Sequence, residues 1–112
     1  PSIKNISSVI EDNEEIRHYV CSLFCKDYAV YEAANGEEGV DVAISKIPDL
    51  IISDIMMPVK DGFTCCRELR EQPRTAHIPI LMLTAKAEDA DVLQASKIGV
   101  DDYMMKPFNP EV

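Results

Sequence analysis

The sequence is poor in positive charge. Its 112 residues include 11 Lys and Arg against 20 Asp and Glu, which gives a formal net charge of −9 at pH 7. Because the phosphate backbone of a nucleic acid attracts Lys and Arg, this balance argues against direct binding to nucleic acid. An acidic chain suits a divalent cation or a basic partner instead.

Paired metal-binding cysteines and long apolar runs are also missing. The chain has only two histidines and no C-x-x-C pair among Cys21, Cys25, Cys65 and Cys66, which disfavours a zinc site. We interpret the adjacent Cys65 and Cys66 as small core residues of a protein in a reducing compartment. The sequence contains no run of about 18 apolar residues and no signal-peptide pattern. We therefore expect a cytoplasmic domain that makes no membrane contact.

The length of 112 residues allows one domain. A hydrophobic content of 46% and a charged content of 28% are typical of a globular protein. The chain starts at Pro1 without an initiator Met and stops at Val112. We therefore expect a single domain over residues 1–112, excised from a longer chain and cut before or within its last helix.

Short apolar runs alternate with amphipathic segments along the chain. Most of the runs are apolar enough to be covered on both faces, as in a parallel sheet. Ser7 and Ser8 make the first run the weakest strand candidate. The predicted strands are Ile3–Ile10, Ala29–Ala33, Leu50–Ser53, Ile80–Leu83 and Asp102–Met105.

Helical periodicity fills the segments between these runs. The predicted helices are Asn13–Lys26, a second from the Asn35 N-cap to Ile47, a third from Gly62 to Leu69, and Glu88–Ile98. The alternating order predicts an α/β fold, a doubly wound five-stranded parallel sheet between two helix layers, of the flavodoxin type. A fifth helix would begin near Asn109 and would be largely missing.

Polar residues follow the predicted strands at the points where they end. Glu11 and Asp12 follow the first strand, Asp54 follows the third, Thr84 ends the fourth, and Lys106 follows the fifth. Ligands of such sheets bind outside the carboxyl ends of the strands, so we expect these side chains in one pocket. Three neighbouring carboxylates repel one another unless a cation neutralises them. Mg²⁺, which prefers oxygen ligands, suits this set.

Such a pocket is suited to phosphoryl transfer. The metal and Lys106 would offset the charge on the transferring group. Asp54 is the natural nucleophile, because a carboxylate forms an acyl phosphate without a general base. Thr84 would donate a hydrogen bond to a phosphoryl oxygen. Each residue alone also has an ordinary structural interpretation, and only their joint occurrence at several strand ends favours the functional one.

Five stretches resemble the receiver domains of response regulators and occur in the same order. They are VIEDNEEIR, AANGEEGV, PDLIISDIMMPVKDGF, HIPILMLTA and GVDDYMMKPF. The resemblance covers essentially the whole chain short of the last helix. It implies that Asp54 is the phosphoacceptor and that Asp12 and Asp54 bind Mg²⁺ directly. It also implies that Glu11 acts mainly through a water molecule and that the Met56 backbone carbonyl completes the protein ligands.

The resemblance further implies a switch. Thr84 would be the switch hydroxyl and Tyr103 the switch aromatic. The phosphoryl group would come from a histidine kinase or its phospho-His domain. Phosphorylation would then change the face formed by helix four, strand five and helix five. That face would bind an output or DNA-binding domain, in the same chain or another, and would also be the surface for a homodimer.

Two segments are most similar to receivers within hybrid sensor histidine kinases, including those with an AraC-type DNA-binding domain. These segments are RELREQPRTAHIPILMLTAKAEDAD and DDYMMKPFNPEV. The parent would then be a histidine protein kinase, in some cases membrane-anchored, that regulates transcription; the domain itself would catalyse only its own phosphorylation and dephosphorylation. A stand-alone regulator is the alternative. An FMN-binding flavodoxin-like protein is disfavoured, because the loop EDNEE would repel phosphate. A receiver used only for docking is disfavoured because the expected site residues are all present.

Overall fold

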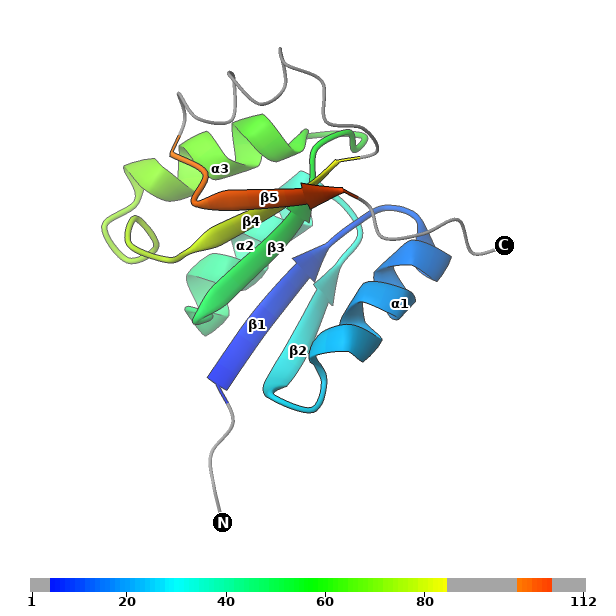
Figure 1. Ribbon diagram of the computed structural model, residues 1–112. Helices are drawn as coiled ribbons and strands as arrows, with labels where there is room; N and C mark the ends of the chain where they lie inside the picture. Colours follow the sequence, from blue (N-terminus) through cyan, green and yellow to red (C-terminus); the bar gives the residue numbers. More distant parts are fainter. Residues whose placement is uncertain (1–4, 85–98, 106–112) are drawn as a thin grey trace.

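The computed structural model describes residues 5–84 and 99–105. All five strands are parallel, in the order β2-β1-β3-β4-β5, which is the doubly wound order of flavodoxin-like sheets (Figure 1). The predicted fold class is therefore confirmed. The predicted helix Glu88–Ile98 and the fifth helix lie outside the described residues. The elements are β1 (Asn5–Ile10), α1 (Glu14–Phe24), β2 (Tyr28–Ala33), α2 (Gly36–Lys46), β3 (Leu50–Asp54), α3 (Gly62–Glu71), β4 (Ile80–Thr84) and β5 (Asp102–Met105).

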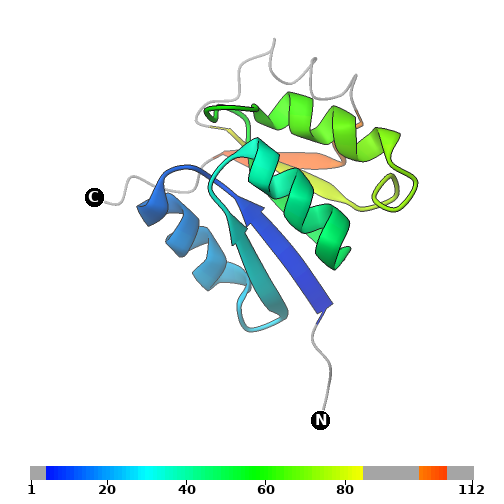
Figure 2. The ribbon, with the colours of Figure 1, turned by 180° about the vertical axis from the view of Figure 1, so that it is seen from behind.

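The helices lie on both faces of the sheet. Helix α1 covers one face, and α2 and α3 cover the other, as the two opposite views show (Figures 1 and 2). Side chains alternate accordingly along β3, where Ile51 packs in the core beside α2 and α3 and Ile52 packs in the core beside α1. Both are fully buried. Burial on two faces explains why the strands are continuous apolar runs.

Strand β1 lies inside the sheet although it carries two serines. It pairs with β2 on one side and β3 on the other. Ser7 and Ser8 are both 0% exposed, and neither hydroxyl has a hydrogen-bond partner within the described part of the chain. The strand forms because both ladders use backbone groups, which any residue except proline supplies. The serines therefore cost stability rather than abolish the strand.

The helices that follow the strands begin at capping side chains. The Asn13 side chain accepts a hydrogen bond from the Ile16 N–H at 3.0 Å. Asn35 does the same for the Glu38 N–H at 2.9 Å, as predicted for the second helix. Such caps fix the point at which the chain turns from strand to helix, and therefore the shape of the loops at the carboxyl end of the sheet.

The cysteines are free thiols, and two of them belong to the core as predicted. Cys65 and Cys66 are each 1% exposed in α3. Burial raises the pKa of the Cys65 thiol to about 12 and also raises the pKa of Cys66. Because the thiolate is the reactive form, these two side chains stay protonated and inert. In residues 5–84 and 99–105 no helix has the length and apolarity needed to cross a bilayer.

Candidate functional site

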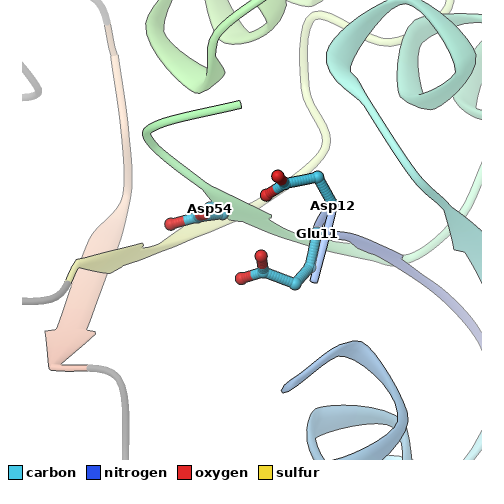
Figure 3. A group of neighbouring side chains, drawn as sticks. All are labelled: Glu11, Asp12 and Asp54. Carbon is cyan, nitrogen blue, oxygen red and sulfur yellow. The ribbon is translucent and has the colours of Figure 1, made fainter. Parts of the chain in front are cut away.

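Three carboxylates meet at the carboxyl end of the sheet. Glu11, Asp12 and Asp54 each offer an oxygen atom, and these oxygens all lie within 4.8 Å of one another (Figure 3). Glu11 and Asp12 follow β1, and Asp54 is the last residue of β3, the strand beside β1. Asp54 lies 42 positions after Asp12 and 43 after Glu11, so only the parallel order of the strands brings it beside them.

Burial makes this cluster electrostatically costly on its own. Glu11 is 0% exposed and Asp54 is 3% exposed, whereas Asp12 is exposed to solvent. Charges that are removed from water must be paired or must coordinate a metal ion. The exposed Asp12 leaves the cluster open to solvent on one side. The arrangement thus favours a small, hard cation that enters from solvent and is held by oxygen ligands.

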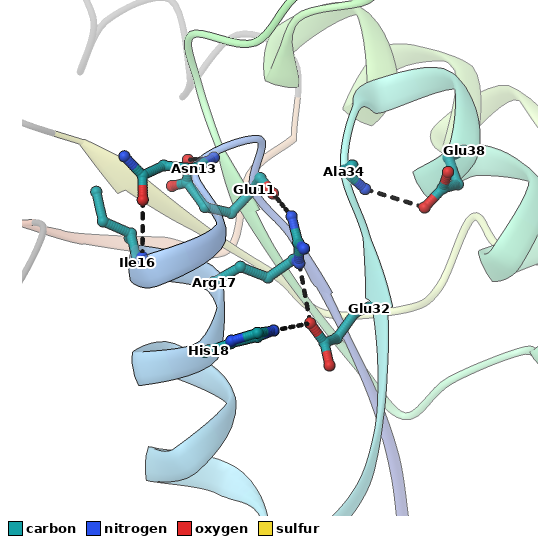
Figure 4. A network of polar contacts seen from close by, with 8 residues as sticks. All are labelled: Glu11, Asn13, Ile16, Arg17, His18, Glu32, Ala34 and Glu38. Atoms are coloured by element: carbon teal, nitrogen blue, oxygen red, sulfur yellow. Dashed lines mark hydrogen bonds and ion pairs between the residues drawn. The ribbon is translucent and has the colours of Figure 1, made fainter.

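Glu11 is held through its backbone as well as its side chain. Its N–H donates to the Ala33 carbonyl at the end of β2, at 3.0 Å. Its carbonyl accepts a 2.9 Å hydrogen bond from Arg17 Nη1, and its Oε2 accepts one of 3.1 Å from the Asn13 N–H (Figure 4). Arg17 was not among the predicted site residues. The available signal was a single basic residue one turn into a helix that begins with acidic residues.

Asp54 is fixed by the chain that follows it. The Ile55 N–H donates to Asp54 Oδ1 at 2.9 Å, and the Ser53 hydroxyl donates to the Asp54 carbonyl at 2.9 Å. The chain then folds back, so that the Gly62 N–H donates to the Ile55 carbonyl at 2.7 Å. A Cβ at Gly62 would collide with the Asp54 carbonyl oxygen, so this close approach requires glycine.

The loop between β3 and α3 exposes two large apolar side chains to solvent. Met56 is 78% exposed and Val59 is 76% exposed. Val59 also has a φ of 70°, in the left-handed region that β-branched residues rarely adopt. Backbone strain of this kind persists only where the surrounding structure enforces it. Met56, the predicted carbonyl ligand, lies in this loop, two residues beyond Asp54.

Two further predicted site residues, Thr84 and Tyr103, are placed by the sheet register alone. Asp54 pairs with Leu83, so Thr84 lies one residue further along β4, at the same edge of the sheet. Tyr103 lies in β5 and pairs with Met82. For Thr84 and Tyr103 the described structure covers the backbone and not the side chain. Lys106 lies outside the described residues.

Comparison with known proteins gives a match over nearly the whole chain. The model of the response regulator receiver domain family matches residues 8–112. The DNA-binding dual master transcriptional regulator RpaA of Synechocystis is 43% identical over 104 residues, which are 92% of this chain and 43% of RpaA. The sensor histidine kinase TmoS of Ectopseudomonas mendocina is 38% identical over 101 residues, which are 90% of this chain and 10% of TmoS. The chain thus spans less than half the length of either relative.

Solved structures agree with the fold. The receiver domain of the sensor histidine kinase PA1611 from Pseudomonas aeruginosa has a TM-score of 0.86 and 30% sequence identity, over 97% of this chain and 90% of that one. That structure holds a magnesium ion coordinated in its active site cleft. The similarity in fold therefore extends to the segments that carry the three carboxylates.

Proposed function

Because this chain belongs to the response regulator receiver domain family, and is thus a receiver domain of two-component signalling, we propose that Asp54 is its phosphoacceptor. The phosphoryl group would come from the phospho-His of a histidine kinase or of its phospho-His domain. One observation carries the proposal: a carboxylate oxygen of Asp54 lies within 4.8 Å of carboxylate oxygens of Glu11 and Asp12. Acidic oxygens at this spacing accommodate a metal-assisted transfer.

The donor set fits Mg²⁺. It consists of oxygen atoms only, two of its three carboxylates are almost fully buried, and one side is open to water. Asp12 and Asp54 would bind the ion directly, Glu11 would act mainly through a water molecule, and the Met56 carbonyl would complete the protein ligands. The magnesium ion in the PA1611 receiver supports this assignment. When bound, the ion would neutralise charge on the phosphoryl oxygens.

The chain's own residues would then perform the transfer. A carboxylate oxygen of Asp54 forms the new bond to phosphorus while the bond from phosphorus to the histidine nitrogen breaks, and the imidazole leaves. The hydrogen bond from the Ile55 N–H holds Asp54 Oδ1 and so orients the side chain for attack. Lys106 would pair with the developing negative charge, and Thr84 would donate to a phosphoryl oxygen.

The added charge would act as a switch. A phosphoryl group brings nearly two negative charges, which biases an element that has two arrangements. Thr84 at the end of β4 and Tyr103 on the neighbouring β5 would connect the site to the face of helix four, strand five and helix five. That face would recruit the output or DNA-binding domain, or a second copy of the domain. Support for this part of the proposal is the adjacency of β4 and β5 in the sheet.

We propose that residues 1–112 form the receiver of a hybrid histidine kinase that works in the cytoplasm. Relatives of both kinds match, because RpaA is a transcriptional regulator and TmoS is a sensor histidine kinase. The stand-alone regulator is therefore the alternative, whereas the family match does not favour the FMN-binding one. The four free cysteines are compatible with a reducing compartment. The sequence upstream of Pro1 in the parent gene decides between hybrid and stand-alone.

The phosphoacceptor is tested by incubating the domain with acetyl phosphate and Mg²⁺ and separating the products on a phosphate-affinity gel. Wild type is expected to give a retarded band that EDTA prevents, and Asp54→Asn is expected to give none. Asp41→Asn is the matched control, because Asp41 is exposed on α2 and loses the same charge. A retarded band of equal intensity from Asp54→Asn would mean that another residue accepts the phosphoryl group.

A further inference from the structure

Arg17 connects the acidic site to the edge strand of the sheet. Its Nη1 donates to the Glu11 carbonyl at 2.9 Å, and its Nε donates to Glu32 Oε1 on β2 at 2.9 Å (Figure 4). The side chain of Arg17 is 14% exposed, so the guanidinium lies between α1 and β2 and not in bulk solvent. Two hydrogen bonds in different directions hold the planar group in one orientation.

The carbonyl that Arg17 holds belongs to the peptide unit between Glu11 and Asp12. A peptide unit is planar, so the position of its oxygen fixes the direction of the bond to the next residue. The other side of Glu11 is already fixed, because its N–H donates to the Ala33 carbonyl. Rotation of this peptide plane would therefore shift the Asp12 carboxylate relative to the Glu11 carboxylate.

We propose that Arg17 is a positioning residue for the divalent-cation site: by holding the Glu11 carbonyl, it sets the relative placement of the Glu11 and Asp12 carboxylates. The inference rests on the proposed function, because it concerns the same site. Glu32 keeps the guanidinium in place and balances its charge. The Nε2 atom of His18 lies 3.5 Å from the same Oε1 atom of Glu32, and the His18 side chain is 58% exposed.

The positive charge of Arg17 and its positioning role predict opposite changes in Mg²⁺ affinity when Arg17 is replaced. A guanidinium near a cation site repels the cation, so its removal should strengthen Mg²⁺ binding if only Coulomb energy mattered. Loss of positioning should weaken binding, because groups that orient metal ligands typically change metal affinity by about 10–100-fold when they are replaced. The sign of the change therefore distinguishes positioning from a simple field effect.

The experiment measures the dissociation constant for Mg²⁺ by isothermal titration calorimetry of the 112-residue chain. Arg17→Met is expected to bind Mg²⁺ about 10-fold more weakly than wild type. Arg17→Lys should fall between the two, because one ammonium group does not reproduce the fork that reaches both acceptors. Glu32→Gln should stay within about two-fold of wild type, because the amide oxygen still accepts from Nε. Arg74→Met is the matched control, exposed between α3 and β4 at the amino end of the sheet.

A second readout separates positioning from loss of structure. The initial rate of phosphorylation by acetyl phosphate is measured against Mg²⁺ concentration, with circular dichroism to verify folding at the assay temperature. In Arg17→Met the half-saturating Mg²⁺ concentration should rise about 10-fold while the rate at saturating Mg²⁺ stays unchanged. A structural defect would lower the saturated rate without moving the midpoint. If Arg17→Met does not fold, the Arg17→Lys titration gives the result.

The outcomes differ for the inference and for the proposed function. Unchanged or tighter Mg²⁺ binding by Arg17→Met, beside clear binding by wild type, would overturn the positioning role and leave the proposed function intact. If wild type bound no Mg²⁺ at millimolar concentration, both would be wrong. Weaker binding by Arg17→Met together with wild-type binding by Arg74→Met is the result that supports the proposal.

Discussion

Arg70, on α3, joins three segments of the chain. Its Nε and Nη2 donate to the Gly99 carbonyl at 3.1 and 2.9 Å, and Nη1 donates to the carbonyls of Ala76 and Ile78 at 3.0 and 2.7 Å. Nη2 also donates to Asp101 Oδ2 at 2.8 Å. Each N–H group of the guanidinium thus makes one hydrogen bond. The network holds α3, the chain before β4 and the turn before β5 together, so its removal should loosen the β5 edge of the sheet.

The structure sets the expected size of the effect of Arg70→Met. The Ile78 carbonyl is partly buried, and leaving such an acceptor without a donor costs about 1–3 kcal/mol. Water replaces Arg70 at the exposed Ala76 and Gly99 carbonyls, which lowers each contribution to roughly 0.5 kcal/mol. The ion pair with Asp101, whose side chain is 55% exposed, contributes about 0–1 kcal/mol. The free energy of unfolding should therefore fall by roughly 2–5 kcal/mol.

Urea unfolding followed by circular dichroism measures this change. Arg70→Met should lower the urea midpoint, and the Tm should fall by about 8 °C or more. Arg70→Lys should recover less than half of the loss, because an ammonium group has three donors and no planar fork. Arg67→Met is the control, since Arg67 is exposed on the same helix; it should change stability by less than about 0.5 kcal/mol. If Arg70→Met were no less stable than Arg67→Met, the reasoning from the hydrogen-bond network would be refuted.

Two further predictions concern the core and the lifetime of the phosphorylated state. Ser8→Ala removes a hydroxyl that is fully buried without a partner among the described residues, so the urea midpoint should rise by the equivalent of about 1 kcal/mol; a clear loss of stability would reveal a partner for that hydroxyl. Met56 and Lys86, two positions beyond Asp54 and Thr84, do not accept a hydrogen bond from an attacking water as Asn, Gln or Glu do. We therefore expect slow self-dephosphorylation and a shorter lifetime in Met56→Asn; loss of ³²P label from wild type within seconds would contradict this.

Local patterns in the sequence were enough to predict the described elements. The predicted strand Leu50–Ser53 corresponds to β3 over Leu50–Asp54, and the helix predicted over Asn13–Lys26 corresponds to α1 over Glu14–Phe24. These predictions succeed because side-chain periodicity and helix caps depend on residues a few positions apart. The serines of β1 show the limit of the same logic. Composition made that strand the weakest candidate, yet ladders on both sides place it inside the sheet.

The candidate site was predictable in part, because the carboxyl ends of parallel strands lie at the same edge of a sheet. Once the strands are parallel, Glu11, Asp12 and Asp54 must share one edge of the sheet, and the structure places their oxygens within 4.8 Å. The partners of the two arginines were not predictable in this way. Arg17 reaches Glu32, 15 positions away, and Arg70 reaches Asp101, 31 positions away.

The amino-acid sequence by itself therefore determined the order of elements, the apolar faces and the acidic residues at the strand ends, because all of these depend on local spacing. Only the tertiary structure decided which backbone carbonyls Arg17 and Arg70 hold, and that the Ser7 and Ser8 hydroxyls are buried without a partner among the described residues. Such contacts depend on how two packed elements approach each other, and angstrom-scale differences in packing that leave the sequence pattern unchanged can make or break a hydrogen bond.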